Sequence, residues 1–460
     1  MTIATESIAV SEGGALDSSQ NDQKTALRFI TCGSVDDGKS TLIGRLLVDS
    51  RAVLQDQLAG VQRKGPDGNT VDLALLTDGL TAEREQGITI DVAYRYFATA
   101  RRKFIIGDAP GHEQYTRNMV TAASSADAAV VLVDATKLDW RDPALQLLPQ
   151  TRRHALLVSL LRVPSVVFAI NKLDAVADPK LAFDHIAAAL RSFAGAARIA
   201  LQAVVPISAL EGWNVALRAA HEGGAAWCGY EGLSLLEILE RLPSAGFDAT
   251  QPFALAVQWV EKLAEKQPAG TDTSQGRRVF WGRVAAGGVQ PGQQVTVMPG
   301  GQTARVAQVL DHARQPRAIL AGRSAGIVLD REIDVSRGDW LLAHEPEGDD
   351  FEAAADPGRT TLHGTVAWMD DEPLVAGRVY WALHGHRWVK ARVRRIVHRL
   401  DVNTLAEEQA DELAPNAIGH VELALQQPLA ARPYAQSRSM GSLVLVDTAS
   451  NRTSGALLVR

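Results

Sequence analysis

The chain has little cysteine and no long unbroken apolar run, and each shortage excludes a class of protein. Only two cysteines, Cys32 and Cys228, occur among 460 residues. We therefore expect no disulfide framework and a cytoplasmic location. The longest apolar stretch, near 155–170, is interrupted by Arg162 and Pro164. This interruption excludes one continuous membrane helix and favours a buried helix followed by a buried strand.

The sequence also shows no excess of positive charge and no repeats, and we expect no secretory signal in it. Its formal net charge is −6 and its isoelectric point is about 6.0, whereas surfaces that bind nucleic acid are usually basic. Residues 1–24 are rich in Ser, Gly, Asp and Gln, without the basic start and apolar core of a secretory signal. We expect a disordered tail over 1–24 and neither membrane nor nucleic acid as a partner. Heptads and repeats of solenoid length are absent from the sequence.

Apolar runs alternate with helical patterns over 25–245. Alternation of this kind predicts a parallel-rich sheet covered by helices on both faces. The expected buried strands are 29–32, 103–107, 128–133, 165–170 and 203–207.

The pattern changes after 242–248, which reads as a domain boundary. Short alternating runs such as 294–297 then stand between turns such as Gln290-Pro291-Gly292. Such runs are typical of small antiparallel barrels. The acidic, apolar-poor run 345–358 reads as a second boundary. We therefore predict an α/β domain over 25–245 and two β-barrel domains over 250–345 and 357–460.

The segment after the first expected strand matches a phosphate-binding loop. Its glycines let the backbone wrap around phosphates, Lys39 supplies charge to the β- and γ-phosphates, and the Ser40 hydroxyl is a ligand for Mg²⁺. A helix that begins near Lys39 adds its N-terminal dipole. The alternative is a simple glycine-rich turn, but this loop follows a strand and opens a helix, as a phosphate-binding loop must. The predicted phosphate-binding residues are Gly33, Ser34, Val35, Asp36, Asp37, Gly38, Lys39, Ser40 and Thr41.

Three further motifs follow in the order of a GTPase. Asp108, at the end of an apolar strand, is expected to hold Mg²⁺, and the N–H of Gly111 is expected to contact the γ-phosphate. The Asp174 carboxylate can accept two hydrogen bonds from guanine, a donor pair that adenine lacks. Each motif alone is compatible with a surface loop, but their order makes coincidence improbable. The predicted guanine-binding residues are Asn171, Lys172, Asp174, Ser208, Ala209 and Leu210.

Two residues are candidates for the hydrolysis step beside Lys39. Thr89 is placed to reach Mg²⁺ and to order the first switch loop in the GTP state. His112 directly follows Gly111 and is placed to orient the attacking water, because phosphoryl transfer needs positioning more than covalent chemistry. The alternative for His112 is a surface histidine.

The longer motifs resemble those of a known family. Thr89 and the run 108–112 resemble the translation elongation factor superfamily of P-loop GTPases. The segments 78–97, 110–119, 150–154 and 332–339 are similar to the large subunit of heterodimeric sulfate adenylyltransferase. The end of the chain, 442–447 with 451–453, resembles the third domain of that subunit.

The resemblance implies a division of labour between two subunits. The family's GTPase subunit binds a smaller catalytic subunit, which makes adenosine 5′-phosphosulfate and pyrophosphate from ATP and sulfate, the first step of sulfate assimilation. GTP hydrolysis, with Mg²⁺, helps to drive this uphill reaction. The adenylyl-transfer residues are then expected on the partner, and the run His384-Gly385-His386 is expected to be a hairpin turn. We find no second phosphate-binding loop and expect no kinase activity.

The chain departs from the family between Asp134 and Gln150, where it is longer. We expect this insertion to be a surface loop that does not touch the nucleotide motifs. The segment 261–276 also fits the family loosely.

Two other functions remain open at this point. One is a translation elongation factor that delivers aminoacyl-tRNA, which would share the fold, Thr89 and His112. The other is a regulatory GTPase scaffold, which would bind GTP and a partner without driving any chemistry.

Overall fold

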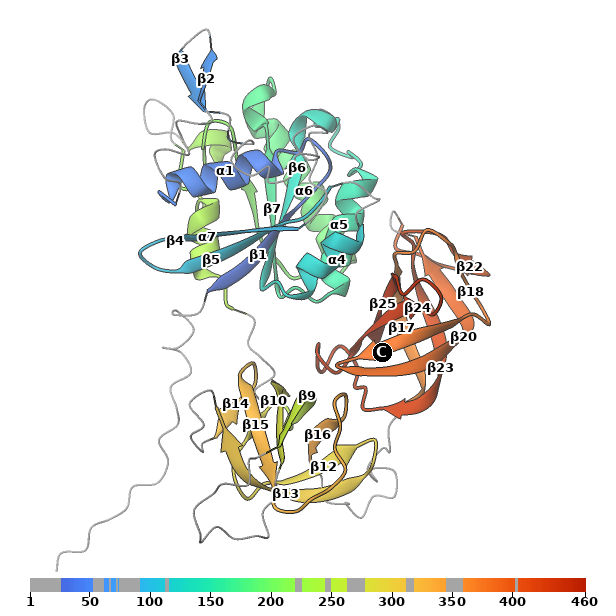
Figure 1. The fold of residues 1–460 in the computed structure, drawn as a ribbon. Coiled ribbons are helices and arrows are strands. Elements are labelled where there is room, and N and C mark those ends of the chain that lie inside the picture. Colours follow the sequence, from blue (N-terminus) through green and yellow to red (C-terminus); the bar gives the residue numbers. More distant parts are fainter. Residues whose placement is uncertain are drawn as a thin grey trace, which may run out of the picture.

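A computed structural model describes residues 26–52, 62–65, 68–71, 73, 92–111, 116–219, 226–244, 250–262, 278–311, 318–344, 359–401 and 404–460. Over these ranges the chain forms an α/β domain followed by two β-rich domains (Figure 1). The expected tail 1–24 and the expected boundary 345–358 lie outside the described residues.

A six-stranded sheet forms the centre of the first domain, in the order β4-β5-β1-β6-β7-β8. The five strands expected from the sequence are present, and their neighbours pair in parallel. The sequence did not predict β4, which pairs antiparallel with β5 at the sheet edge and buries only Phe97. The strands of this domain are β1 (Leu27–Cys32), β2 (Gln62–Gly65), β3 (Gly68–Val71), β4 (Ala93–Ala98), β5 (Lys103–Asp108), β6 (Ala128–Asp134), β7 (Ser165–Asn171) and β8 (Leu201–Pro206).

Helices cover both faces of this sheet, which explains why the central strands are apolar throughout. Alternate residues of β6 enter opposite cores: Val130 and Leu132 pack with α1 and α7, while Val131 and Val133 pack with α4, α5 and α6. The expected helix-then-strand reading of 155–170 is confirmed by α5 and β7. The helices are α1 (Lys39–Asp49), α4 (Thr116–Ser124), α5 (Pro149–Leu160), α6 (Pro179–Ala196) and α7 (Leu235–Arg241), with short 3₁₀ turns η4 (Ala135–Lys137), η5 (Leu173–Ala175) and η6 (Trp227–Gly229).

The second domain is a closed antiparallel barrel, in the order β10-β15-β13-β12-β16-β9. Its apolar interior is built from one face of each strand, as the short alternating runs predict. The strands are β9 (Ala254–Lys262), β10 (Arg278–Ala286), β11 (Gly288–Val289), β12 (Gln294–Met298), β13 (Gln302–Leu310), β14 (Ile319–Leu320), β15 (Ser324–Leu329) and β16 (Trp340–Ala343).

The third domain is a second antiparallel barrel, in which β19 pairs with both β24 and β20 and so closes the sheet. Gly385 and His386 form the two-residue turn between β19 and β20, where His384 pairs with Arg387. The expected hairpin is therefore confirmed. The strands are β17 (Arg359–Trp368), β18 (Leu374–Val375), β19 (Val379–His384), β20 (Arg387–Leu400), β21 (Glu407–Glu408), β22 (Glu412–Leu413), β23 (Ile418–Leu429), β24 (Ser442–Asp447) and β25 (Thr453–Val459).

The third domain packs against both of the others. The buried Tyr434 hydroxyl donates to the Leu161 carbonyl at 2.8 Å, at the end of α5. Arg387 pairs with Asp339 of the second domain at 2.8 Å. Among the described residues, no helix is both long and apolar enough to cross a membrane.

Candidate nucleotide-binding site

The phosphate-binding loop connects β1 to α1, at the carboxyl end of the sheet. Gly38 caps α1 with φ 92°, a left-handed conformation that favours glycine. A Cβ on Gly38 would lie 2.4 Å from Asn171 Nδ2. Conformation and space therefore both require glycine at this turn, as the sequence motif implies.

Lys39 is held inside the loop rather than extended into solvent. Its Nζ donates to the carbonyls of Gly33 at 3.1 Å and Ser34 at 2.7 Å. Burial lowers the pKa of the Lys39 amine, while the nearby carboxylates of Asp108 and Asp37 oppose that shift. The buried Ser34 hydroxyl has no hydrogen-bond partner within the described parts of the chain. The loop thus presents a cation and an unpaired hydroxyl, a combination suited to phosphate oxygens.

Asp108 and Gly111 bring the end of β5 against this loop. The Asp108 carboxylate is buried and accepts a hydrogen bond from the Thr31 hydroxyl at 3.2 Å. A Cβ on Gly111 would lie 2.6 Å from both the Gly33 carbonyl oxygen and Lys39 Nζ. The backbone at Gly111 is therefore close enough to the phosphate-binding loop to respond to what the loop holds.

Asn171 joins the phosphate end of the site to the expected guanine end. Its side-chain amide donates to the Asp37 carbonyl at 2.8 Å and accepts from the Ala209 N–H at 3.0 Å. Asp174, three residues later, is exposed at the surface beside this link. A base bound here would meet the exposed Asp174 carboxylate. The two hydrogen bonds of the Asn171 side chain hold the backbone of Asp37 and Ala209 beside it.

The segment 208–210 forms the other wall of the expected base site. Ser208 is buried and Leu210 is exposed, and Arg45 of α1 donates to the carbonyls of Ala209 and Leu210. Because the Ala209 N–H already donates to Asn171, a base oxygen would have to share this donor or use the N–H of Leu210.

Lys137 is a residue of this site that the sequence analysis missed. Its Nζ donates to the Val35 carbonyl at 2.6 Å and to Asp37 Oδ1 at 3.0 Å. It also lies 3.9 Å from Asp134 Oδ2, which pairs with Lys172 Nζ at 2.8 Å. A chain of charges therefore connects the phosphate-binding loop to the guanine motif.

This network corrects the expectation that the insertion after Asp134 does not touch the nucleotide motifs. Burial raises the pKa of the Asp37 carboxyl, and its hydrogen bond with Lys137 opposes that shift. The signal that could have identified Lys137 is an acidic residue inside the phosphate-binding loop, because a buried carboxylate requires a paired cation.

The insertion is also not confined to the surface. The side chains of Leu138, Trp140, Leu145 and Leu147 are buried in the core shared with α5 and α6. The Trp140 carbonyl is 3.0 Å from His185 Nδ1 on α6. The expectation was wrong because it considered the length of the insertion but not its apolar residues. These side chains can be buried only if the insertion folds back on the domain.

Thr89 and His112 lie outside the described residues. The described Mg²⁺ candidates are compatible with that ion, since Ser40 and Asp108 offer a hydroxyl and a carboxylate at the mouth of the loop, and Mg²⁺ binds such oxygens together with phosphate and water. No group of three or more His, Cys, Asp or Glu side chains that could hold a metal alone occurs within the described residues.

Comparisons with known proteins agree with the motifs. The family model "Elongation factor Tu GTP binding domain" matches residues 24–245, and "GTP-eEF1A C-terminal domain-like" matches residues 361–460. Sulfate adenylyltransferase subunit 1 of Laribacter hongkongensis is 44% identical over 96% of this chain and 86% of its own length. The same subunit of Tolumonas auensis is 43% identical over 98% of this chain and 90% of its own length. The "Bifunctional enzyme CysN/CysC" of Xylella fastidiosa is 47% identical over 95% of this chain, which spans 66%, just under two thirds, of that longer protein.

Proposed function

The chain belongs to the sulfate adenylyltransferase subunit 1 family, and from this premise we propose how its GTPase site serves the enzyme. The chain is the GTPase subunit of sulfate adenylyltransferase. In the proposal, GTP hydrolysis drives the formation of adenosine 5′-phosphosulfate and pyrophosphate from ATP and sulfate, which takes place on a smaller catalytic subunit in the cytoplasm. The observation that supports this most strongly is the near full-length similarity to subunit 1, combined with a phosphate-binding loop in which Lys39 Nζ is held by the carbonyls of Gly33 and Ser34.

Each predicted site residue that the structure describes has a proposed role in holding GTP. Lys39 and the backbone N–H groups of 33–41 bind the phosphates, and the Ser34 hydroxyl is placed to donate to one of their oxygens. Ser40 and Asp108 would hold Mg²⁺, which, when bound, neutralises charge on the β- and γ-phosphates. Gly111 would signal the presence of the γ-phosphate because its backbone lies so close to Gly33 and Lys39 that a Cβ would not fit.

Guanine recognition is assigned to Asp174, supported by Asn171. The exposed Asp174 carboxylate accepts from the ring N–H and the exocyclic amine of guanine, a donor pair that adenine does not offer. Asn171 holds the surrounding backbone through its bonds to Asp37 and Ala209. Lys172 and the segment 208–210 line the base, and the N–H of Leu210 is the donor proposed for the guanine oxygen.

Hydrolysis and its timing are assigned to the segments that flank the described site. Thr89 would order the first switch loop when GTP is present, and His112 would orient the attacking water. The ordered surface would engage the catalytic subunit, and hydrolysis would reset it.

The test is an assay of adenosine 5′-phosphosulfate with the chain and the small protein that copurifies with it. ATP, sulfate, Mg²⁺ and pyrophosphatase are supplied, with GTP, without it, or with a non-hydrolysable GTP analogue. We expect GTP, but not the analogue, to raise the product yield, and Lys39→Ala to abolish the increase. GTP-dependent binding of aminoacyl-tRNA without any product would contradict the proposal.

A further inference from the structure

One buried carboxylate in the α/β domain faces two lysines from different parts of the nucleotide site. Asp134 is the last residue of β6 and is 1% exposed, and it pairs in the sheet with Asn171 at the end of β7. Its Oδ2 lies 2.8 Å from Lys172 Nζ and 3.9 Å from Lys137 Nζ. The carboxyl end of β6 therefore lies directly beside the predicted guanine motif.

The other oxygen of Asp134 fixes the direction in which the carboxylate points. Oδ1 accepts hydrogen bonds from the Thr136 N–H at 2.9 Å and from the Thr136 hydroxyl at 2.6 Å. A short side chain that bonds the backbone two residues later is held by its own turn. The turn after β6 therefore directs Oδ2 toward Lys172.

The ion pair with Asp134 anchors the end of the Lys172 side chain. This side chain is 36% exposed, and within the described residues Asp134 is the only carboxylate paired with it. A lysine whose ammonium group is held can present its apolar stem to a neighbouring ring. Ordering a long side chain during binding weakens affinity, so a stem that is already ordered binds its ligand more tightly.

Lys137 differs from Lys172 because it has a second acidic partner. Its Nζ lies 3.0 Å from Asp37 Oδ1, inside the phosphate-binding loop. Neutralising Asp134 would therefore release Lys172 while Lys137 stays paired. Two ammonium groups that share one carboxylate would also repel each other once its charge is lost.

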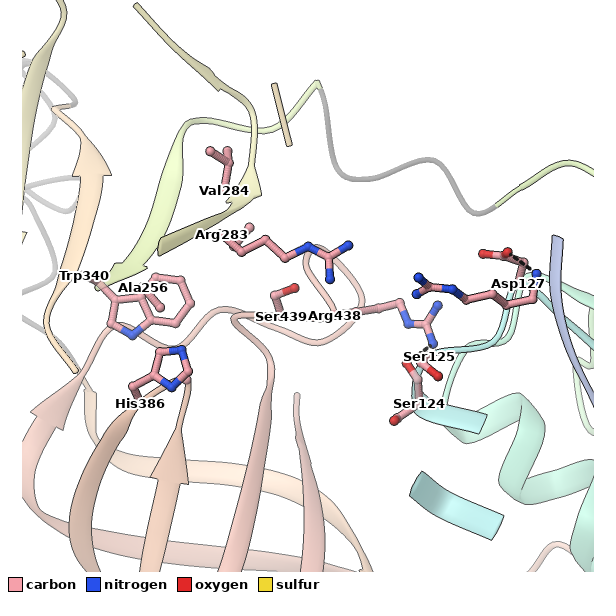
Figure 2. A pocket seen from close by; sticks show the side chains of 13 residues that line it. Ser124, Ser125, Asp127, Ala256, Arg283, Val284, Trp340, His386, Arg438 and Ser439 are labelled. Carbon is pink, nitrogen blue, oxygen red and sulfur yellow. Dashed lines mark hydrogen bonds between the residues drawn. The ribbon is translucent and has the colours of Figure 1, made fainter. Parts of the chain in front are cut away.

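These ion pairs are separate from the cavity of about 370 Å³ where the three domains meet. That cavity is lined by Trp340 and Arg438, among others (Figure 2), and neither Asp134 nor its two lysines are among the described residues of its wall. The charged partners of Asp134 all lie in the α/β domain. Loss of its charge is therefore expected to act on the nucleotide site and not on the contacts in that cavity.

We propose that Asp134 is a positioning residue for guanine recognition, which it serves by fixing the Lys172 side chain where the base binds. This inference rests on the proposed GTP site and adds to it a residue outside the phosphate-binding and guanine motifs. Because the same carboxylate also faces Lys137, it links the base side of the site to the phosphate-binding loop.

The experiment is a double-mutant cycle on the full chain, with affinities for GTP and GDP measured by isothermal titration calorimetry in the presence of Mg²⁺. The variants are Asp134→Asn, Lys172→Met and the two combined. Asparagine keeps an oxygen that can accept from Thr136 but removes the charge, and methionine keeps an apolar side chain that a carboxylate cannot hold. The matched control is Asp184→Asn, which neutralises an aspartate of α6 that lies 2.6 Å from Lys180.

We expect each single variant to bind GTP and GDP about fivefold more weakly, in line with the cost of ordering one long side chain. The double variant should bind no more weakly than Lys172→Met alone, because Asp134 acts through Lys172, and the control should be unchanged. A purely structural role of Asp134 would instead give losses that multiply in the double variant.

Multiplying losses, a loss confined to GTP, or an Asp134→Asn variant that binds GTP as the unaltered protein does would each overturn the proposal. Failure of the unaltered chain to prefer GTP to ATP would contradict the proposed function itself. The two failures are therefore distinguishable.

Discussion

At the scale of single residues, the phosphate-binding loop contains a charge pair between Lys137 and Asp37. Asp37 is 1% exposed and interacts electrostatically with both Lys39 and Lys137, in the loop that we propose binds the phosphates. We expect its negative charge to be compatible with phosphate binding only while Lys137 balances it. Lys137 also donates a hydrogen bond to the Val35 carbonyl of the loop, and we therefore propose it as a positioning residue.

We predict that Lys137→Met weakens GTP binding about tenfold, since loss of one hydrogen bond to a charged group costs about 1.5 kcal/mol. Isothermal titration calorimetry with GTP and with GDP measures the effect. Lys137→Arg should restore most of the affinity because it keeps the charge. Lys180→Met, which removes an exposed lysine paired only with Asp184 in the described structure, is the matched control. Equal affinity of the Lys137→Met variant and the unaltered protein would refute the positioning role.

At the scale of secondary-structure elements, the insertion after β6 is an integral part of the α/β domain, because its apolar side chains lie in the core. Its 3₁₀ turn η4 supplies Lys137, and its apolar side chains extend the core over α6. The Trp140 ring is 8% exposed and lies under the Arg141 guanidinium, 4.4 Å from its centroid. The insertion therefore couples the stability of this domain to the position of Lys137.

We predict that Trp140→Ala destabilises the α/β domain by about 3 kcal/mol, the usual cost of a large aromatic truncation in a core. Denaturation by urea, followed by circular dichroism, measures this loss. The control is Asp139→Ala, because the neighbouring Asp139 is exposed. A midpoint shared by the Trp140→Ala variant and the unaltered protein would mean that the insertion is not part of the core.

Elements with a strong local pattern could be predicted from the sequence, and elements defined by distant partners could not. The five parallel strands were evident because burial on both faces makes them apolar throughout. The edge strand β4 was not, because it buries only Phe97 and exposes Tyr94, Tyr96 and Ala98. The Asn171 bridge and the Lys137 network were also missed, since each joins residues about 100 or more positions apart in the chain.

At the scale of the whole molecule, His384 connects the two barrels. Its Nε2 lies 2.9 Å from the Met440 carbonyl within the third domain, and its ring stacks on Trp340 of the second domain at 5.1 Å between centroids. Burial lowers the pKa of His384 to about 4. The contact between the barrels therefore contains a neutral imidazole.

We predict that acid weakens the third domain and this contact. In the unfolded chain a histidine titrates near pH 6.5, so below that pH protons bind the unfolded chain before the folded one. The stability that His384 contributes is complete above about pH 6.5 and is lost as the pH falls toward 4, about 2 kcal/mol by pH 5. Urea unfolding at pH 7 and pH 5 measures the loss. His384→Gln keeps a donor for Met440 without titrating and should reduce the pH dependence by that amount; an unchanged dependence would exclude His384 as its source.

The central claim about the molecule is that GTP hydrolysis drives adenylyl transfer rather than regulating it. The direct measurement is the ratio of GTP hydrolysed to adenosine 5′-phosphosulfate formed by the chain with its partner, without pyrophosphatase. We predict a fixed ratio, and product that rises above the level reached from ATP and sulfate alone. Faster approach to that same level, with GTP consumption that does not scale with product, would contradict coupling and show a regulatory GTPase instead.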